Sequence, residues 1–381
     1  MNDHKSALSR STDLLLALTA LTLGGALLAN HPFGQIFPAI AFLLYAVLVF
    51  CQPSSFLVII PALLPIAGFA PWTGWITFEE LDLMILATAT GGYARHAADR
   101  NQKSTQRPSL LLLVLATLMS MSVLISMFRG FTDAGGFSFG WFQGYDGPMN
   151  SLRIGKSFFL ALLLTPLITR LQNTPETNVS RKLAIGTAIG LGAASLAALW
   201  ERLAFTGLLN FSSDYRTTVL FWEMHVGGAA LDGWLLLSVP FSIWALRNAR
   251  STWHAMIALG LILLAGYASL TTFSRGVYLA LAVALPLLAL NKRPQALKNI
   301  EQEPPTWGTR KWIVAFVLLS VMAGLVFPTG GYRGLLALVG LIAVSLSMDS
   351  IFRQSAPRQL LISVVAGVTA GSILDRSGQG G

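Results

Sequence analysis

Charged side chains are scarce in this sequence. Asp, Glu, Lys and Arg make up 11% of its 381 residues, and hydrophobic residues make up 54%. An average soluble domain carries about 25% charged residues, so the composition excludes a water-soluble globular protein. It predicts an all-α fold, a polytopic bundle of membrane-spanning helices.

Residues that commonly hold metals or nucleotides are also few. Cys51 is the one cysteine, which excludes an intramolecular disulfide. The sequence contains no G-x-x-x-x-G-K-[ST] loop, no H-E-x-x-H segment and no paired cysteines. We therefore expect no metal, no cofactor and no hydrolysis of ATP.

Apolar runs fill most of the chain, and each crossing of a membrane takes about 20 such residues. Thirteen runs lie at about 13–29, 34–51, 55–71, 81–94, 108–128, 156–170, 183–200, 229–246, 253–273, 276–290, 312–328, 334–350 and 359–374. We expect 12 or 13 transmembrane helices in a single integral-membrane domain that covers residues 1–381.

The basic residues give the expected direction of each helix. If the N-terminus is cytoplasmic, 18 of the 26 lysines and arginines fall on the cytoplasmic side and eight on the other. This asymmetry follows the positive-inside rule. The net charge of +9 is thus explained by helix anchoring, and we expect no nucleic-acid partner.

The expected outer loop at 200–241 is dense in ionisable side chains. It contains Glu201, Arg202, Asp214, Arg216, Glu223, His225 and Asp232. Arg216 lies among serines and threonines, and the planar fork of its guanidinium suits phosphate oxygens. A salt bridge from Arg216 to Asp214 or Glu223 is the alternative. Glu201 and Arg202 are interpreted as a structural ion pair or interface anchor.

His225 is a candidate for proton transfer. It precedes Gly227 and Gly228, where backbone can approach a ligand, and Asp232 follows seven residues later. A histidine near the membrane surface can accept a proton near neutral pH. The alternative is a histidine that is hydrogen-bonded for structural reasons.

Two further outward turns each present one arginine. Arg275 follows Ser274 in TTFSRG, and Arg333 lies in FPTGGYRG. An interfacial anchor is the alternative for Arg275, although such anchors usually cluster with Lys, Trp or Tyr. Guanidiniums that meet over one cavity repel one another unless an anion joins them, and a pyrophosphate supplies that charge. The aromatic loop at 129–156 is interpreted as interfacial.

The segment DYRTTVLFWEMHVGGA, followed by a helix and TTFSRG, resembles the O-antigen ligase and polymerase family over about residues 200–290. The resemblance implies a GT-C-like, metal-independent glycosyltransferase of the bacterial inner membrane. Such an enzyme takes a glycan from undecaprenyl pyrophosphate at the periplasmic face and passes it to lipid A core or to another glycan.

The resemblance also implies that Arg216 and Arg275 hold the pyrophosphate and stabilise the leaving group. We predict Arg216, Arg275 and His225 as catalytic residues. The predicted substrate-binding residues are Arg333, Asp214, Glu223, Asp232 and Ser274.

One difference from the family concerns a histidine in a large periplasmic loop beyond the SRG helices. This sequence has no histidine after His254 and reaches LDRSGQGG about where that loop would begin. We expect that the chain lacks the family's last loop and helices. The alternatives are that His225 takes this role, or that the protein binds lipid-linked glycan without turnover. A transporter or flippase of the same lipid is the rival hypothesis, although transporters bind nearer the bilayer midplane.

Overall fold

The computed structural model describes most of the first 290 residues. The described ranges are 2–32, 34–67, 76–99, 110–144, 146–174, 177–208, 215–221, 229–249 and 251–290. Within these ranges the chain is helical, and the one β-bridge there, between Ile76 and Phe142, belongs to no strand. The all-α prediction is confirmed, and the GT-C-like arrangement stays a prediction.

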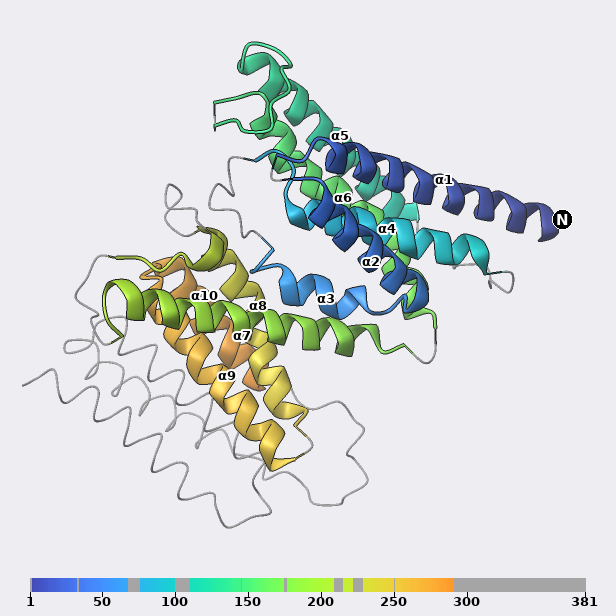
Figure 1. Cartoon of the computed structure of the whole chain (residues 1–381). Helices are drawn as coiled ribbons and strands as arrows, with labels where there is room; N and C mark the ends of the chain where they lie inside the picture. Colours follow the sequence, from blue (N-terminus) through green and yellow to red (C-terminus); the bar gives the residue numbers. More distant parts are fainter. Residues whose placement is uncertain are drawn as a thin grey trace, which may run out of the picture. The chain divides into compact units, whose positions relative to one another are not determined.

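α-Helices follow one another along the described ranges (Figure 1). They are α1 (Asn2–Ala29), α2 (Ile36–Cys51), α3 (Phe56–Leu63), α4 (Glu80–Ala98), α5 (Leu110–Asp133), α6 (Met149–Gln172), α7 (Val179–Phe205), α8 (Ala229–Arg247), α9 (Thr252–Thr271) and α10 (Arg275–Leu290), with a 3-10 helix η1 (Val219–Phe221) before α8. Each predicted helix up to residue 290 matches one of these α-helices. The predicted helices at 312–328, 334–350 and 359–374 lie outside the described residues.

The prediction of a membrane-length helix at 55–71 is wrong in extent. α3 has 8 residues and ends at Leu63, and residues 64–66 form a turn. Pro61 lies inside the helix and Pro65 follows it, and proline has no N–H to donate to a helical carbonyl. A helix of this length covers about 12 Å, whereas the hydrocarbon core is about 30 Å thick.

Five described helices are long and apolar enough to cross a membrane: the part of α1 from Arg10 to Ala29, α5, α6, α7 and α9. α5 packs against α6 but is exposed along most of its length, because its most apolar 18-residue window contains no buried residue. Leu118, Met121 and Ile125 are each more than half exposed. Such a surface is unfavourable in water, so we interpret it as lipid-facing.

We predict that Leu118→Arg impairs membrane insertion of α5. A charged side chain near the centre of a spanning helix costs about 2.5–3.5 kcal/mol, whereas Leu118→Ala should be tolerated. Cysteine labelling from each side of the membrane, in a Cys51→Ser background, would measure the inserted fraction. Full insertion of the arginine variant would contradict a lipid-facing α5.

The chain divides into two compact units, which we describe one at a time. Unit 1 contains Met1–Ala197 and Thr218–Gly228, and unit 2 contains Ala198–Thr217 and Ala229–Gly381. The prediction of a single integral-membrane domain over residues 1–381 is not tested by this division and stays a prediction.

α4 is the centre of unit 1 and packs against α1, α2 and α6 (Figure 1). Its glycines allow close approach: a methyl group added at Gly91 would lie 2.2 Å from the carbonyl oxygen of Ala46 in α2. Tyr93 ties α4 to α6, because its hydroxyl donates to the carbonyl of Leu163 at 2.7 Å. The small residues of α4 therefore determine how near its neighbours lie.

We expect Gly91→Ala to destabilise unit 1 by about 1–3 kcal/mol, because the contacting atom is backbone and α2 would have to move. Gly25→Ala in α1 is the matched control, since a methyl group there meets nothing within 4 Å. That change should be neutral or stabilise the helix by up to about 1 kcal/mol. Unfolding in detergent micelles would compare the two, and equal stabilities would contradict the tight α2–α4 contact.

Charged side chains at one end of unit 1 join the start of α1 to the ends of α4 and α6. Arg170 in α6 pairs with Asp13 in α1 at 2.9 Å. Arg10 Nε donates to the carbonyl of Ala97 at the end of α4, at 2.6 Å. α1 therefore runs opposite to α4 and α6, as the predicted alternation of helices requires.

A buried ion pair lies at the other end of unit 1. Lys156 in α6 pairs with Asp82 in α4 and donates to the carbonyl of Thr77 at 2.7 Å. Asp82 also accepts from the backbone N–H of Glu79 at 2.8 Å, as part of a capping box for α4. Burial, partly offset by Lys156, raises the pKa of the Glu79 carboxyl. These bonds fix the start of α4 against α6.

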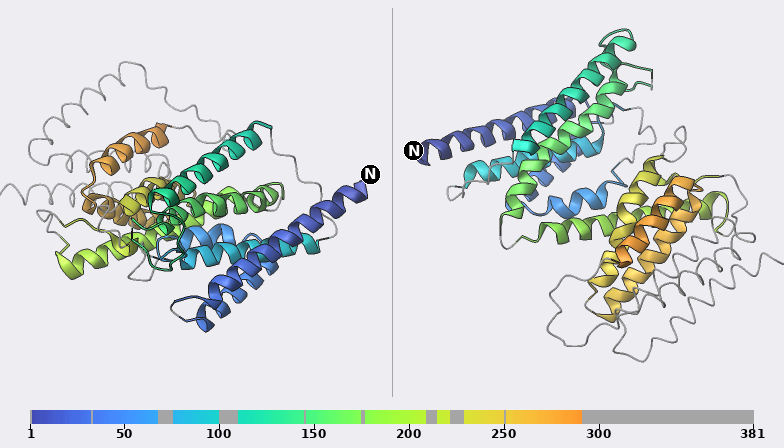
Figure 2. Two further views of the ribbon diagram at one scale, coloured as in Figure 1. Left: turned by 90° about the horizontal axis from the view of Figure 1, so that it is seen from above. Right: turned by 180° about the vertical axis from the view of Figure 1, so that it is seen from behind.

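In unit 2, α8 packs against α9 and α10 (Figure 2). Small buried residues of α9, such as Ala265 and Ala268, allow this close packing, and Leu235 of α8 is fully buried. α9 ends at Thr271 and α10 begins at Arg275, so residues 272–274 alone join them. This turn carries the TTFSRG segment.

Candidate functional site

Four of the predicted site residues lie in the described part of unit 2. Arg216 precedes α8, Asp232 is in the first turn of α8, and Ser274 and Arg275 lie where α10 begins. The other predicted residues are Asp214, Glu223, His225 and Arg333, which lie outside the described residues.

Arg216 is held against the turn between α9 and α10. Its Nε donates to the carbonyl of Thr272 at 2.8 Å, and its Nη2 donates to Asp232 Oδ2 at 3.3 Å. The backbone N–H of Thr217 also donates to the carbonyl of Thr271, at 3.2 Å. The side chain of Arg216 remains 37% exposed, so part of the guanidinium is open to a ligand.

Arg275 is the first residue of α10, three residues after the carbonyl that Arg216 contacts. Its side chain is exposed, and it has no carboxylate partner among the described residues. The N-terminus of a helix carries a partial positive charge, so a cation there is unfavourably placed unless an anion joins it. The two predicted catalytic arginines therefore come from segments that touch, and no carboxylate of the described residues pairs with Arg275.

Ser274 has a structural role at the start of α10. Its Oγ accepts from the backbone N–H of Val277 at 3.5 Å, as an N-cap side chain does. Its own N–H donates to Thr272 Oγ1 at 3.3 Å. The prediction that Ser274 binds substrate remains, but these bonds already use part of its hydrogen-bonding capacity.

Among the described residues, Asp232 is the carboxylate partner of Arg216; Asp214 and Glu223, the partners considered from the sequence, lie outside them. The Oδ1 atom of Asp232 is buried and has no hydrogen-bond partner among the described residues. A carboxylate in the first turn of a helix is favourably placed with respect to the helix dipole. Asp232 therefore occupies part of the Arg216 fork that we predicted for a phosphate.

The expected outer loop begins later than predicted, because Glu201 and Arg202 belong to α7. Both are buried, and Arg202 is fully buried. Tyr215 donates from its hydroxyl to Glu201 Oε1 at 2.7 Å, and Arg202 Nη1 donates to the carbonyl of Tyr215 at 3.2 Å. The end of α7 thus holds the residue that precedes Arg216, which supports the structural interpretation of Glu201 and Arg202.

The Tyr215 hydroxyl remains a donor at neutral pH. Burial first, and then the hydrogen bond to Glu201 and its negative charge, raise the pKa of Tyr215 above its usual value. The ring also stacks on Phe205, with centroids 5.9 Å apart and an interplanar angle of 22°. The sequence analysis did not include Tyr215 among the functional residues. Two signals could have indicated it: Tyr215 adjoins Arg216, and the charged pair Glu201 and Arg202 at the end of an apolar run needs hydrogen-bonding partners.

Comparison of the chain with known protein families, with curated proteins and with solved structures finds no match. The family resemblance drawn from residues 200–290 therefore stays a prediction.

Among the described residues, no group of three or more His, Cys, Asp and Glu side chains could hold a metal ion. The expectation of a metal-independent protein stays a prediction. The end of unit 2 that contains the turn at residues 272–274 carries three guanidiniums and two carboxylates. They belong to Arg202, Arg216, Arg275, Glu201 and Asp232, so the formal charge of these five groups is 3 − 2 = +1. The described groups favour an anionic ligand.

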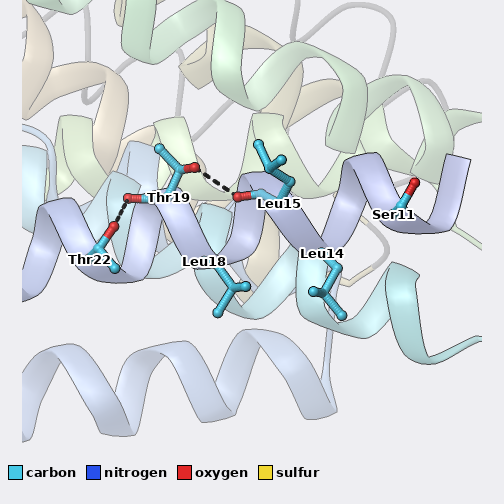
Figure 3. A pocket seen from close by; sticks show the side chains of 6 residues that line it. All are labelled: Ser11, Leu14, Leu15, Leu18, Thr19 and Thr22. Carbon is cyan, nitrogen blue, oxygen red and sulfur yellow. Dashed lines mark hydrogen bonds between the residues drawn. The ribbon is translucent and has the colours of Figure 1, made fainter. Parts of the chain in front are cut away.

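A recess along α1 in unit 1 is less suited to an anion (Figure 3). It is lined by Ser11, Leu14, Leu15, Leu18, Thr19 and Thr22. The hydroxyls of Thr19 and Thr22 donate to helix carbonyls at 2.8 and 3.0 Å, and the described residues that line it include no basic side chain. We interpret it as part of the lipid-facing surface.

Two of the ion-paired aspartates, Asp82 and Asp232, should differ in their effect on stability. Asp82→Ala should cost about 3–5 kcal/mol, because it leaves the charge of buried Lys156 without a partner. Asp232→Ala should cost at most about 1 kcal/mol, because the partly exposed Arg216 can be solvated. Free energies of unfolding in detergent would measure both, and an equal or reversed order would contradict this account. Lys156→Met should recover part of the loss in the Asp82→Ala variant.

Proposed function

We propose that the end of unit 2 at the turn between α9 and α10 binds the pyrophosphate of a lipid-linked glycan, and that the protein transfers or polymerises that glycan. The observation that carries the proposal is the 2.8 Å hydrogen bond from Arg216 Nε to the carbonyl of Thr272. It brings the loop arginine to the turn from which Arg275 extends.

Charge and exposure favour a phosphate ligand over a purely structural role. Arg275 is exposed at a helix N-terminus, where a bound anion would offset both its own charge and that of the helix end. Arg216 keeps part of its guanidinium open beside Asp232. Two guanidinium groups from adjacent segments suit a diphosphate, because each can contact a separate phosphoryl group.

The proposed step is a displacement at the anomeric carbon of the donor sugar. The acceptor hydroxyl oxygen forms a bond to that carbon, the bond to the pyrophosphate oxygen breaks, and the pyrophosphate leaves with the electron pair. Arg216 and Arg275 stabilise the charge that grows on the leaving group. A base takes the hydroxyl proton, and His225 is our candidate for it. Asp214, Glu223, Asp232, Ser274 and Arg333 are proposed to line the substrate site.

The membrane-spanning helices fit a donor with a long lipid tail. In the described part of the chain, five helices are long and apolar enough to cross a bilayer, so the tail of undecaprenyl pyrophosphate could lie in lipid while its head group meets charged residues at a helix end. We propose the bacterial inner membrane, with a cytoplasmic N-terminus and the site on the periplasmic face. The acceptor would be lipid A core or a second glycan.

Turnover by the purified full-length chain in nanodiscs would test the proposal, with a labelled glycan on undecaprenyl pyrophosphate as donor. Arg216→Ala and Arg275→Ala should each lower the transfer rate about 100-fold or more, because each removes a donor to the developing charge. Arg181→Ala is the matched control, since Arg181 is also an exposed arginine, at the start of α7. It should transfer glycan like the parent.

Three other outcomes would overturn the proposal. Movement of labelled lipid across liposomes with no change in glycan length would indicate a transporter. Variants of Arg216 and Arg275 that keep the parent's melting temperature and its rate of transfer would show that these arginines do not act on the pyrophosphate. Binding of donor without transfer to either acceptor would indicate an assembly subunit.

A further inference from the structure

The turn between α9 and α10 contains a residue in an unusual conformation. Phe273 has φ of +52°, in the left-handed region that glycine commonly occupies. For a bulky side chain this conformation is unfavourable, and it persists where the surroundings hold it. Phe273 lies between Thr272, which accepts from Arg216, and the Ser274–Arg275 start of α10.

The Phe273 ring contacts the buried guanidinium of Arg202. The Cζ atom of Arg202 lies 5.9 Å from the ring centroid, and Arg202 is fully buried. Cation–π attraction is stronger when the cation is removed from water. The left-handed backbone of Phe273 is thus accompanied by a contact that a glycine at this position would not make.

The same guanidinium also holds the segment that carries Arg216. Arg202 Nη1 donates to the carbonyl of Tyr215, the residue before Arg216. Tyr215 is fixed a second time by its hydroxyl bond to Glu201. One buried side chain therefore contacts the neighbour of Arg216 on one side and the turn before Arg275 on the other.

We propose that Arg202 and Phe273 are positioning residues that set the spacing between Arg216 and Arg275 for a diphosphate. This inference rests on the proposed function, because it concerns the same anion site. Neither residue touches the ligand. The guanidinium of Arg202 donates a hydrogen bond to one segment and lies over the Phe273 ring of the other, and the single ammonium of lysine lacks this planar fork.

Binding of inorganic pyrophosphate and of farnesyl pyrophosphate to the full-length chain in nanodiscs would test this role. Phe273→Leu keeps apolar bulk and removes the ring face, and it should weaken binding about tenfold. Phe273→Tyr keeps the ring and should bind like the parent. Arg202→Lys should weaken binding to a similar extent, and if it fails to fold, the Phe273 variants carry the test.

A double-mutant cycle separates positioning from general stability. In an Arg216→Ala background, Phe273→Leu should weaken binding no further. The spacing between Arg216 and Arg275 that Phe273 sets has no effect on binding once the Arg216 guanidinium is removed. The same loss in both backgrounds would overturn the proposal, as would unchanged binding by Phe273→Leu alone. Melting temperatures of the ligand-free variants would show that each is folded.

Failure of the proposed function gives a different result. If the parent binds neither probe, or if Arg216→Ala and Arg275→Ala bind both probes like the parent, the anion site itself is wrong and the positioning role falls with it. If those two variants lose affinity while Phe273→Leu and Arg202→Lys do not, the anion site stands and the positioning role is wrong.

Discussion

The cost of placing a charge in apolar surroundings governs how this chain folds. An ion removed from water needs an opposite charge and hydrogen bonds, and few charged residues occur among so many apolar ones. In unit 1 the buried charges meet this requirement by joining helix ends, as Lys156 does with Asp82 and Arg170 with Asp13. In unit 2, Arg216 pairs with Asp232 and also donates to the turn that precedes exposed Arg275, and the proposed function follows from that arrangement.

Up to residue 290 the sequence predicted the described helices well, because long apolar runs need no tertiary information to be recognised. The predicted ends were less accurate. The helix at 183–200 continues through Glu201 and Arg202 to Phe205, since Tyr215 supplies partners that let both charges be buried. α3 is shorter than its apolar run because Pro61 and Pro65 lack the N–H that a longer helix requires.

The candidate site was predicted in part. The order of the Arg216 loop and the SRG turn indicated that these segments belong together, and the contact between Arg216 and Thr272 bears out their proximity. The choice of Asp232 as the partner of Arg216, and the roles of Arg202 and Phe273, depend on packing among α7, α8 and α9. No periodicity or motif carries that information, because the contacts join residues far apart in sequence.

The turn at residues 272–274 joins helix ends of opposite polarity. Arg216 donates to a carbonyl at the negative end of α9, whereas Arg275 stands at the positive end of α10. The first arginine is thus held in place by the protein itself, whereas the second is unfavourably placed with respect to the dipole of its own helix. In the proposed function, an arriving anion would be anchored by the preorganised guanidinium and would offset the charge of the other.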